Sequence, residues 1–144
     1  MSTFVLDASV TMSWLLGDAR PVDRTYADAV LDALGSPGCS ASVPMTWALE
    51  VGNVVARAEA RGFVEEAQSE AFLEMLASVA IQPDDSTFAR ALTDTLHLAR
   101  RYGLSSYDAS YLELALRAGL PLATLDTGLS KAARKAGVKR FGPR

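Results

Sequence analysis

The sequence predicts an α/β fold, an α/β/α sandwich in which helices cover both faces of a mostly parallel sheet of four to five short strands. Short apolar runs that suit strands alternate with longer amphipathic runs that suit helices. Parallel strands need such helical crossovers between them, so the alternation favours a parallel sheet. No linker, internal repeat or low-complexity tract divides the 144 residues, which indicates a single domain over residues 1–144.

The N-terminal third supplies two strands and two helices. The apolar run FVLD opens a strand over residues 4–9, and a helix is expected over 10–17. A second helix over 22–34 is expected to end at Gly35, because glycine commonly follows the last residue of a helix. The small and branched residues of 39–44 suit a brief strand.

The middle of the chain adds two helices and a strand. A helix over residues 46–60 has Thr46 as a candidate N-cap. The next helix, 64–79, opens with acidic residues that suit the positive end of the helix dipole. Residues 80–83 form a short strand that ends at proline.

The C-terminal part is expected to be mainly helical. Residues 86–103 have the pattern of one long amphipathic helix, and 105–119 form a helix with a serine N-cap. Residues 120–126 are the clearest strand, because apolar residues dominate them. A last short helix over 127–137 is followed by a candidate final strand, 138–141.

Composition places the chain among ordinary globular proteins. Apolar residues make up 49% and charged residues 22%. No apolar stretch approaches the ~20 residues that a membrane-spanning helix needs, and no signal-peptide pattern opens the sequence. The single cysteine, Cys39, excludes an internal disulfide and fits a reducing compartment, so a cytoplasmic location is expected.

Charge is unevenly distributed along the chain. The net charge is −3, but residues 1–126 carry 17 acidic and eight basic groups, whereas 127–144 carry six basic groups and no acid. These basic residues are Lys131, Arg134, Lys135, Lys139, Arg140 and Arg144. A basic end on an acidic body can steer a polyanion, although charge alone favours the simpler interpretation of a solvated helix face and a frayed terminus.

Two acidic residues follow predicted strands. Asp7 ends the apolar run FVLD and Asp126 ends LATLD. In parallel α/β sheets ligands bind outside the carboxyl ends of the strands, so both positions are candidates for a site. Each residue could instead cap the helix that follows it, and this alternative is stronger for Asp126, because Ser9 can replace Asp7 as a cap.

Two further acidic residues lie in predicted helices. Asp108 falls on the apolar stripe of its helix, one turn before Tyr111. The helix dipole favours an acid in this first turn, but it does not explain why the acid is on the buried face. Glu50 lies at the edge of an apolar stripe, with Asn53 one turn on. A structural partner for Glu50 would be Arg57, which is too distant for a direct helical pair.

Together the four carboxylates suggest a cation site. Clustered carboxylates repel one another unless a cation lies between them. Oxygen donors without histidine or cysteine suit Mg²⁺ better than zinc. The single histidine, His97, lies in a helix beside two arginines and is expected at the surface rather than in catalysis.

The order of four motifs resembles the PIN-domain ribonucleases, and in particular the VapC toxins of type II toxin–antitoxin pairs. The motifs are VLDAS, P-x-x-W-x-x-E-V-x-N, L-S-x-Y-D-A-x-Y-L-x-L-A and L-A-T-L-D-x-x-L. The resemblance implies a PIN fold and an acidic quartet that binds Mg²⁺ or Mn²⁺. The implied quartet is Asp7, Glu50, Asp108 and Asp126, with Ser9, Asn53 and Thr124 as supporting polar residues.

The resemblance also implies an activity and partners. The expected reaction is endoribonuclease cleavage by a metal-activated water, leaving 5′-phosphate and 3′-hydroxyl ends. The expected RNA contacts are Lys131, Arg134, Lys135, Lys139 and Arg140. The expected partners are a small VapB-type antitoxin and a second copy of the chain, joined into larger complexes with the antitoxin.

Two other interpretations remain open at this stage. One is an aspartyl-phosphate protein, such as a receiver domain or a phosphohydrolase, although neither strand end carries the adjacent acid pair that this chemistry favours. The other is a catalytically silent module that binds an antitoxin through apolar helical surface. That surface would come from Val10, Met12, Trp14, Leu15, Leu16, Ala27, Val30, Leu31 and Leu34.

Overall fold

The computed structural model describes residues 2–142 and contains a parallel sheet of four short strands. The strands are β1 (Ser2–Leu6), β2 (Cys39–Val43), β3 (Ile81–Pro83) and β4 (Leu122–Ala123). Their order across the sheet is β3-β2-β1-β4, and all three pairings are parallel. The predicted α/β architecture is therefore confirmed, with every strand pair parallel.

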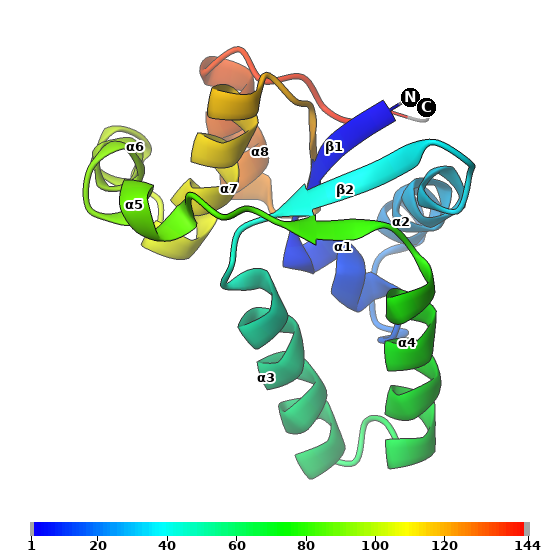
Figure 1. Cartoon of the computed structure of the whole chain (residues 1–144). Coiled ribbons are helices and arrows are strands. Elements are labelled where there is room, and N and C mark those ends of the chain that lie inside the picture. Colours follow the sequence, from blue (N-terminus) through cyan, green and yellow to red (C-terminus); the bar gives the residue numbers. More distant parts are fainter. Residues whose placement is uncertain (1, 143–144) are drawn as a thin grey trace.

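Eight helices connect and cover these strands within the described residues. They are α1 (Ala8–Ser13), α2 (Pro21–Leu34), α3 (Trp47–Ala60), α4 (Glu66–Ser78), α5 (Thr87–Ala91), α6 (Asp94–Tyr102), α7 (Ser106–Ala118) and α8 (Thr127–Lys135). Figure 1 shows α6, α7 and α8 grouped on one side of the sheet and α1 and α2 on the other, with α3 and α4 extending away as an antiparallel pair.

The alternating side chains of β1 explain why this strand is apolar on both faces. Phe4 and Leu6 pack with α2, whereas Val5 packs with α7 and α8. All three side chains are fully buried, as expected for a parallel strand covered by helices on both sides. A run of three fully buried side chains therefore lies directly before Asp7.

The C-terminal strands are shorter than predicted. The expected strand 120–126 pairs regularly only at Leu122 and Ala123. The expected strand 138–141 contributes one parallel bridge, between Leu122 and Arg140. Side chains hold this segment in place as well, because the rings of Phe141 and Phe4 stack with their centroids 3.8 Å apart.

The predicted helix over residues 86–103 was wrong in its continuity, because it is two helices, α5 and α6. Thr93 has φ −119° and ψ −99°, outside the helical range, and both its N–H and its hydroxyl donate to the carbonyl of Arg90. These bonds close the last turn of α5 and interrupt the series of helical backbone hydrogen bonds. The first helix was displaced, since α1 begins at Ala8 and ends at Ser13.

A buried ion cluster fixes α7 to the end of β3. Arg117 of α7 pairs with Asp84, which follows β3, at 2.7 Å, and with Glu113, one turn earlier in α7, at 2.8 Å. The Asp84 and Glu113 side chains are only 9% and 6% exposed. The cluster thus sets the position of α7 relative to the sheet. Among residues 2–142, no helix is both long and apolar enough to span a bilayer.

Candidate functional site

The sheet topology brings two of the predicted site residues to one edge. Asp7 directly follows β1 and Asp126 follows β4, and these strands are adjacent and parallel. The Asp7 N–H donates to the carbonyl of Ala123 at 3.0 Å, so the two strand ends are held side by side. Glu50 and Asp108 are presented by the first turns of α3 and α7.

The two strand-end aspartates behave differently as helix caps. Asp7 occupies the N-cap position of α1, but its side chain makes no capping hydrogen bond. Asp126 caps α8, because its Oδ2 accepts the N–H of Leu129 at 2.7 Å. The capping alternative is therefore correct for Asp126, whereas the carboxylate of Asp7 is used elsewhere.

Asp7 is the centre of a small hydrogen-bond network. Its Oδ2 accepts the hydroxyls of Ser9 at 2.5 Å and Thr124 at 2.8 Å. Each hydroxyl in turn accepts a backbone N–H, from Leu125 to Ser9 and from Asp126 to Thr124. Because each hydroxyl has one proton and donates it to Asp7, the network fixes this carboxylate as an acceptor. Burial nevertheless raises the pKa of Asp7, and the charge of Asp126 adds to the effect.

Glu50 is the least satisfied acid of the group. Its Oε2 accepts the hydroxyl of Tyr111 at 3.3 Å, but Oε1 is buried without a hydrogen-bond partner within residues 2–142. Burial first, and then the charges of Asp7 and Asp108, raise the pKa of Glu50 to about 7, against the opposing effect of the Tyr111 hydrogen bond. An unpartnered oxygen and a raised pKa both indicate that a positive charge beside Glu50 would stabilise its ionised carboxylate.

Asp108 shows the same electrostatic signature. Burial, and then the charges of Asp126 and Asp7, raise its pKa to about 6. Its backbone N–H donates to the Ser105 hydroxyl, the predicted serine N-cap, at 3.1 Å. Capping therefore does not require the Asp108 carboxylate, which lies half-buried beside the other acids.

The four carboxylates share their surroundings without a basic partner. Ion pairs between described residues link Arg20 to Asp23, Arg90 to Asp94, and Arg117 to Asp84 and Glu113, and none involves the four acids. Repulsion within the group is thus left uncompensated by the protein itself.

The donor set fits a hard divalent cation. The candidate ligands are carboxylate and hydroxyl oxygens, and neither Cys39 nor His97 lies among them. Within residues 2–142 no three acidic, histidine or cysteine side chains are grouped closely enough to enclose a metal ion by themselves. An open carboxylate set of this kind suits Mg²⁺, which usually keeps several of its waters.

Two other predicted neighbours of Glu50 lie elsewhere. Asn53 and Arg57 are exposed on α3 and line a separate groove of about 680 Å³, together with Leu15 and Leu16. Of the apolar surface predicted near the chain start, Leu15 and Leu16 are thus partly accessible. Val10, Met12, Ala27, Val30 and Leu34 are core residues.

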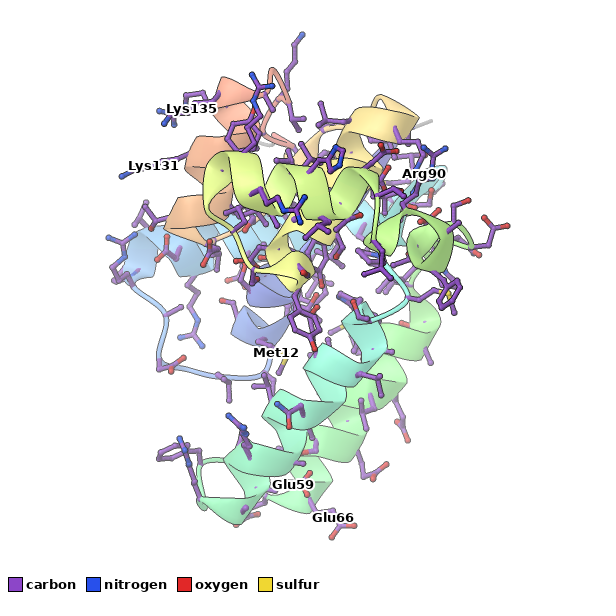
Figure 2. All side chains as sticks on the ribbon, turned by 90° about the vertical axis from the view of Figure 1, so that its left-hand side faces the viewer. Met12, Glu59, Glu66, Arg90, Lys131 and Lys135 are labelled. Atoms are coloured by element: carbon purple, nitrogen blue, oxygen red, sulfur yellow. The ribbon has the colours of Figure 1, made fainter. Side chains whose placement is uncertain are left out.

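The predicted RNA-contacting residues divide into groups. Lys131, Arg134 and Arg140 line a hollow of about 300 Å³ that also includes Thr124 and Asp126. Lys139 lines an adjoining hollow with Arg134 and Arg140. Lys135 projects to solvent from α8, as Figure 2 shows. The basic C-terminal part is therefore beside the acidic group, and His97 is exposed on α6 as expected.

No role in the site was predicted for two tyrosines, Tyr111 and Tyr26. Tyr111 is fully buried and binds Glu50, and its position three residues after Asp108 on the same helix face was the available signal. Tyr26 lies against Arg140, with the guanidinium carbon 3.7 Å from the ring centroid. No local pattern announces this second contact, because the two residues are far apart in the chain.

Comparison with known proteins bears on the fold and the family of the chain. The chain is 33% identical to Ribonuclease VapC3 of Pyrobaculum aerophilum over 84 residues, which cover 58% of this chain and 64% of that protein, less than two thirds of its length. The crystal structure of PAE2754 from Pyrobaculum aerophilum has the same fold, with a TM-score of 0.66 and 23% identity over 91% of this chain and 86% of that one.

The family assignment rests on a longer match. The sequence pattern of the PIN domain matches residues 4–135, which run from β1 through α8 and include all four carboxylates. The matched region therefore contains the end of β1, the whole of β2, β3 and β4, and both strand ends that carry aspartates. The chain belongs to the PIN domain family.

Proposed function

We propose that this protein is the toxin of a type II toxin–antitoxin pair and acts as a Mg²⁺- or Mn²⁺-dependent endoribonuclease. The observation that carries the proposal is the convergence of Asp7, Glu50, Asp108 and Asp126, whose mutual repulsion no basic side chain relieves. The similarity to Ribonuclease VapC3 supports the choice of RNA as substrate.

The acidic side chains have distinct tasks in this proposal. Asp7, Glu50 and Asp108 would hold the cation, and Asp126 would contribute least because its Oδ2 already accepts the N–H of Leu129. A bound divalent cation would lower the pKa of a water molecule and screen charge on the phosphate oxygens. Ser9 and Thr124 keep the Asp7 carboxylate oriented, and Tyr111 does the same for Glu50.

The reaction is hydrolysis of a phosphodiester bond with water as the nucleophile. No side chain forms a covalent intermediate, and the exposed His97 has no part in the reaction. The products carry 5′-phosphate and 3′-hydroxyl ends, because the RNA 2′-hydroxyl does not attack. Lys131, Arg134, Lys135, Lys139 and Arg140 contribute to attraction of the RNA, and the action takes place in the cytoplasm.

Two protein partners complete the proposal. One is a VapB-type antitoxin, supported by the similarity to Ribonuclease VapC3. The other is a second copy of the chain, supported by exposed apolar side chains of α3 and of α5 with its C-cap residue. Leu49 is 76%, Phe88 89% and Leu92 83% exposed, and large apolar side chains at the surface are candidates for a protein contact. Light scattering of the wild type and of Phe88→Ser tests the homodimer, which the substitution is expected to weaken.

The decisive experiment is cleavage of total RNA by the purified protein, followed by mapping of the new ends. Cleavage is expected with Mg²⁺ or Mn²⁺, is lost in excess EDTA, and falls by about 10²-fold or more in Asp7→Asn. Asp28→Asn, an exposed aspartate of α2, is the matched control and keeps full activity. Cleavage that persists in EDTA, or products with cyclic phosphate ends, would overturn the proposal.

A further inference from the structure

We propose that the hollow beside Asp126 binds a phosphate of the RNA strand next to the one that is cleaved, and that Tyr26 is a positioning residue that holds Arg140 towards this phosphate. This inference rests on the proposed function for the identity of the polyanion. It assigns distinct roles to basic residues that sequence alone treated as one group.

The hollow is continuous with the acidic group. It has a volume of about 300 Å³ and is formed by the end of β4, by α8 and by the C-terminal segment. Thr124 and Asp126 belong to its wall, and Thr124 also donates to Asp7 at 2.8 Å. A strand whose cleaved phosphate lies at the carboxylates therefore has its neighbouring phosphate within reach of this hollow.

The charges in the hollow suit an anion. Its basic side chains are Lys131, Arg134 and Arg140, and its acidic ones are Asp23 and Asp126. Asp23 is already paired with Arg20 at 2.8 Å, and Asp126 accepts the Leu129 N–H. The ion pairs of the described chain include none of the three basic residues, so their charge remains for a ligand.

Arg140 differs from the other two because its side chain is pre-positioned. Its guanidinium lies 3.7 Å from the ring centroid of Tyr26. A guanidinium over a ring keeps its charge, and those of its N–H groups that do not contact the tyrosine can donate to a phosphate. Tyr26 is only 7% exposed, and its hydroxyl donates to the carbonyl of Phe141 at 2.7 Å, so the ring itself is fixed.

The backbone that carries Arg140 is anchored as firmly. Arg140 bridges to Leu122 of β4, and the Phe141 N–H donates to the Leu122 carbonyl at 2.9 Å. The strand that presents Thr124 and Asp126 therefore also fixes the position of Arg140. Lys135, by contrast, projects from α8 into solvent with no such support (Figure 2).

RNA binding without cleavage tests the inference. The affinity of a labelled single-stranded RNA of about ten nucleotides is measured by fluorescence anisotropy in EDTA, between ~50 and ~200 mM salt. Arg140→Gln is expected to weaken binding about tenfold at low salt and to reduce the slope of log affinity against log salt by ~0.7. Lys135→Gln removes the same charge from the same region and is expected to weaken binding less than about twofold.

A double-mutant cycle separates positioning from structure. Tyr26→Phe keeps the ring and is expected to bind as the wild type does. Tyr26→Leu removes it and is expected to weaken binding about threefold. Adding Tyr26→Leu to Arg140→Gln is expected to cause no further loss of affinity, because both changes remove the same interaction. Arg140→Lys, which needs no core substitution, is expected to lose affinity while it keeps the salt slope.

The possible contradictions are distinct. Equal losses in Arg140→Gln and Lys135→Gln would show a diffuse electrostatic effect and refute the subsite. An independent, additive loss from Tyr26→Leu, or full affinity in Arg140→Lys, would refute the positioning role. If the protein cleaves RNA normally but binds it equally well without Arg140, this inference alone is refuted. If RNA binding depends on Arg140 but the protein cleaves no RNA, the proposed function alone is refuted.

Discussion

Replacement of Glu50 by glutamine is expected to stabilise the metal-free protein at alkaline pH and to have a much smaller effect in acid. Burial and neighbouring carboxylates raise the pKa of Glu50 from an ordinary value of 4.5 to about 7. Between pH 4.5 and about 7, Glu50 therefore keeps a proton in the folded protein that it has already released in the unfolded chain. The stability that this proton contributes is fully present below pH 4.5 and is lost as the pH rises through about 7.

The magnitude follows from the two pKa values. Ionisation of Glu50 costs the folded state about 0.8 kcal/mol at about pH 5 and about 3.3 kcal/mol at about pH 8, a difference of about 2.5 kcal/mol. Part of this cost is shared with Asp7 and Asp108, so about 1–2.5 kcal/mol is expected for Glu50→Gln. For a chain of this size that corresponds to a Tm higher than that of the wild type by roughly 3–10 °C at the alkaline pH.

Thermal unfolding in EDTA at the two pH values measures this difference. Glu70→Gln, an exposed glutamate of α4, is the control and should leave the Tm unchanged. Added Mg²⁺ should raise the Tm of the wild type more than that of Glu50→Gln, because only the native site of the wild type is complete. A pH-independent effect of Glu50→Gln, or a loss of stability at the alkaline pH, would refute the electrostatic account of the site.

Three other substitutions test separate parts of the structure. Arg117→Met leaves two buried acids unpaired and should lower the free energy of unfolding, measured in urea, by about 2–4 kcal/mol. Arg90→Met breaks an exposed ion pair and should lower it by less than ~1 kcal/mol. Equal effects of the two substitutions would contradict the argument from burial. Thr124→Val removes a hydroxyl that orients Asp7 and should weaken Mn²⁺ binding about 10–100-fold by calorimetry; unchanged affinity would argue against this supporting role. Ser105→Ala removes the N-cap of α7 and should cost ~1 kcal/mol in the same urea assay, and a neutral result would show that the cap is dispensable.

Much of the fold was predictable because its signals are local. The apolar runs located β1 and β2, and the serine before α7 was correctly read as its cap. Gly103 and Gly119 end α6 and α7 with φ of 65° and 67°, a conformation that glycine adopts without strain. The break at Thr93 escaped prediction, because the apolar periodicity continues across it and only the two bonds to Arg90 show where the helix stops.

The sequence by itself determined which carboxylates were candidates, since strand ends and helix faces can be read from apolar runs and periodicity. Only the tertiary structure decided what each one does: Asp7 is held by Thr124 from 117 residues away, and Glu50 by Tyr111 from 61 residues away. It also placed Asn53 at a different groove and set Arg140 against Tyr26. The physical reason is that periodicity specifies which face of an element is buried, whereas the partner on that face depends on how distant elements pack.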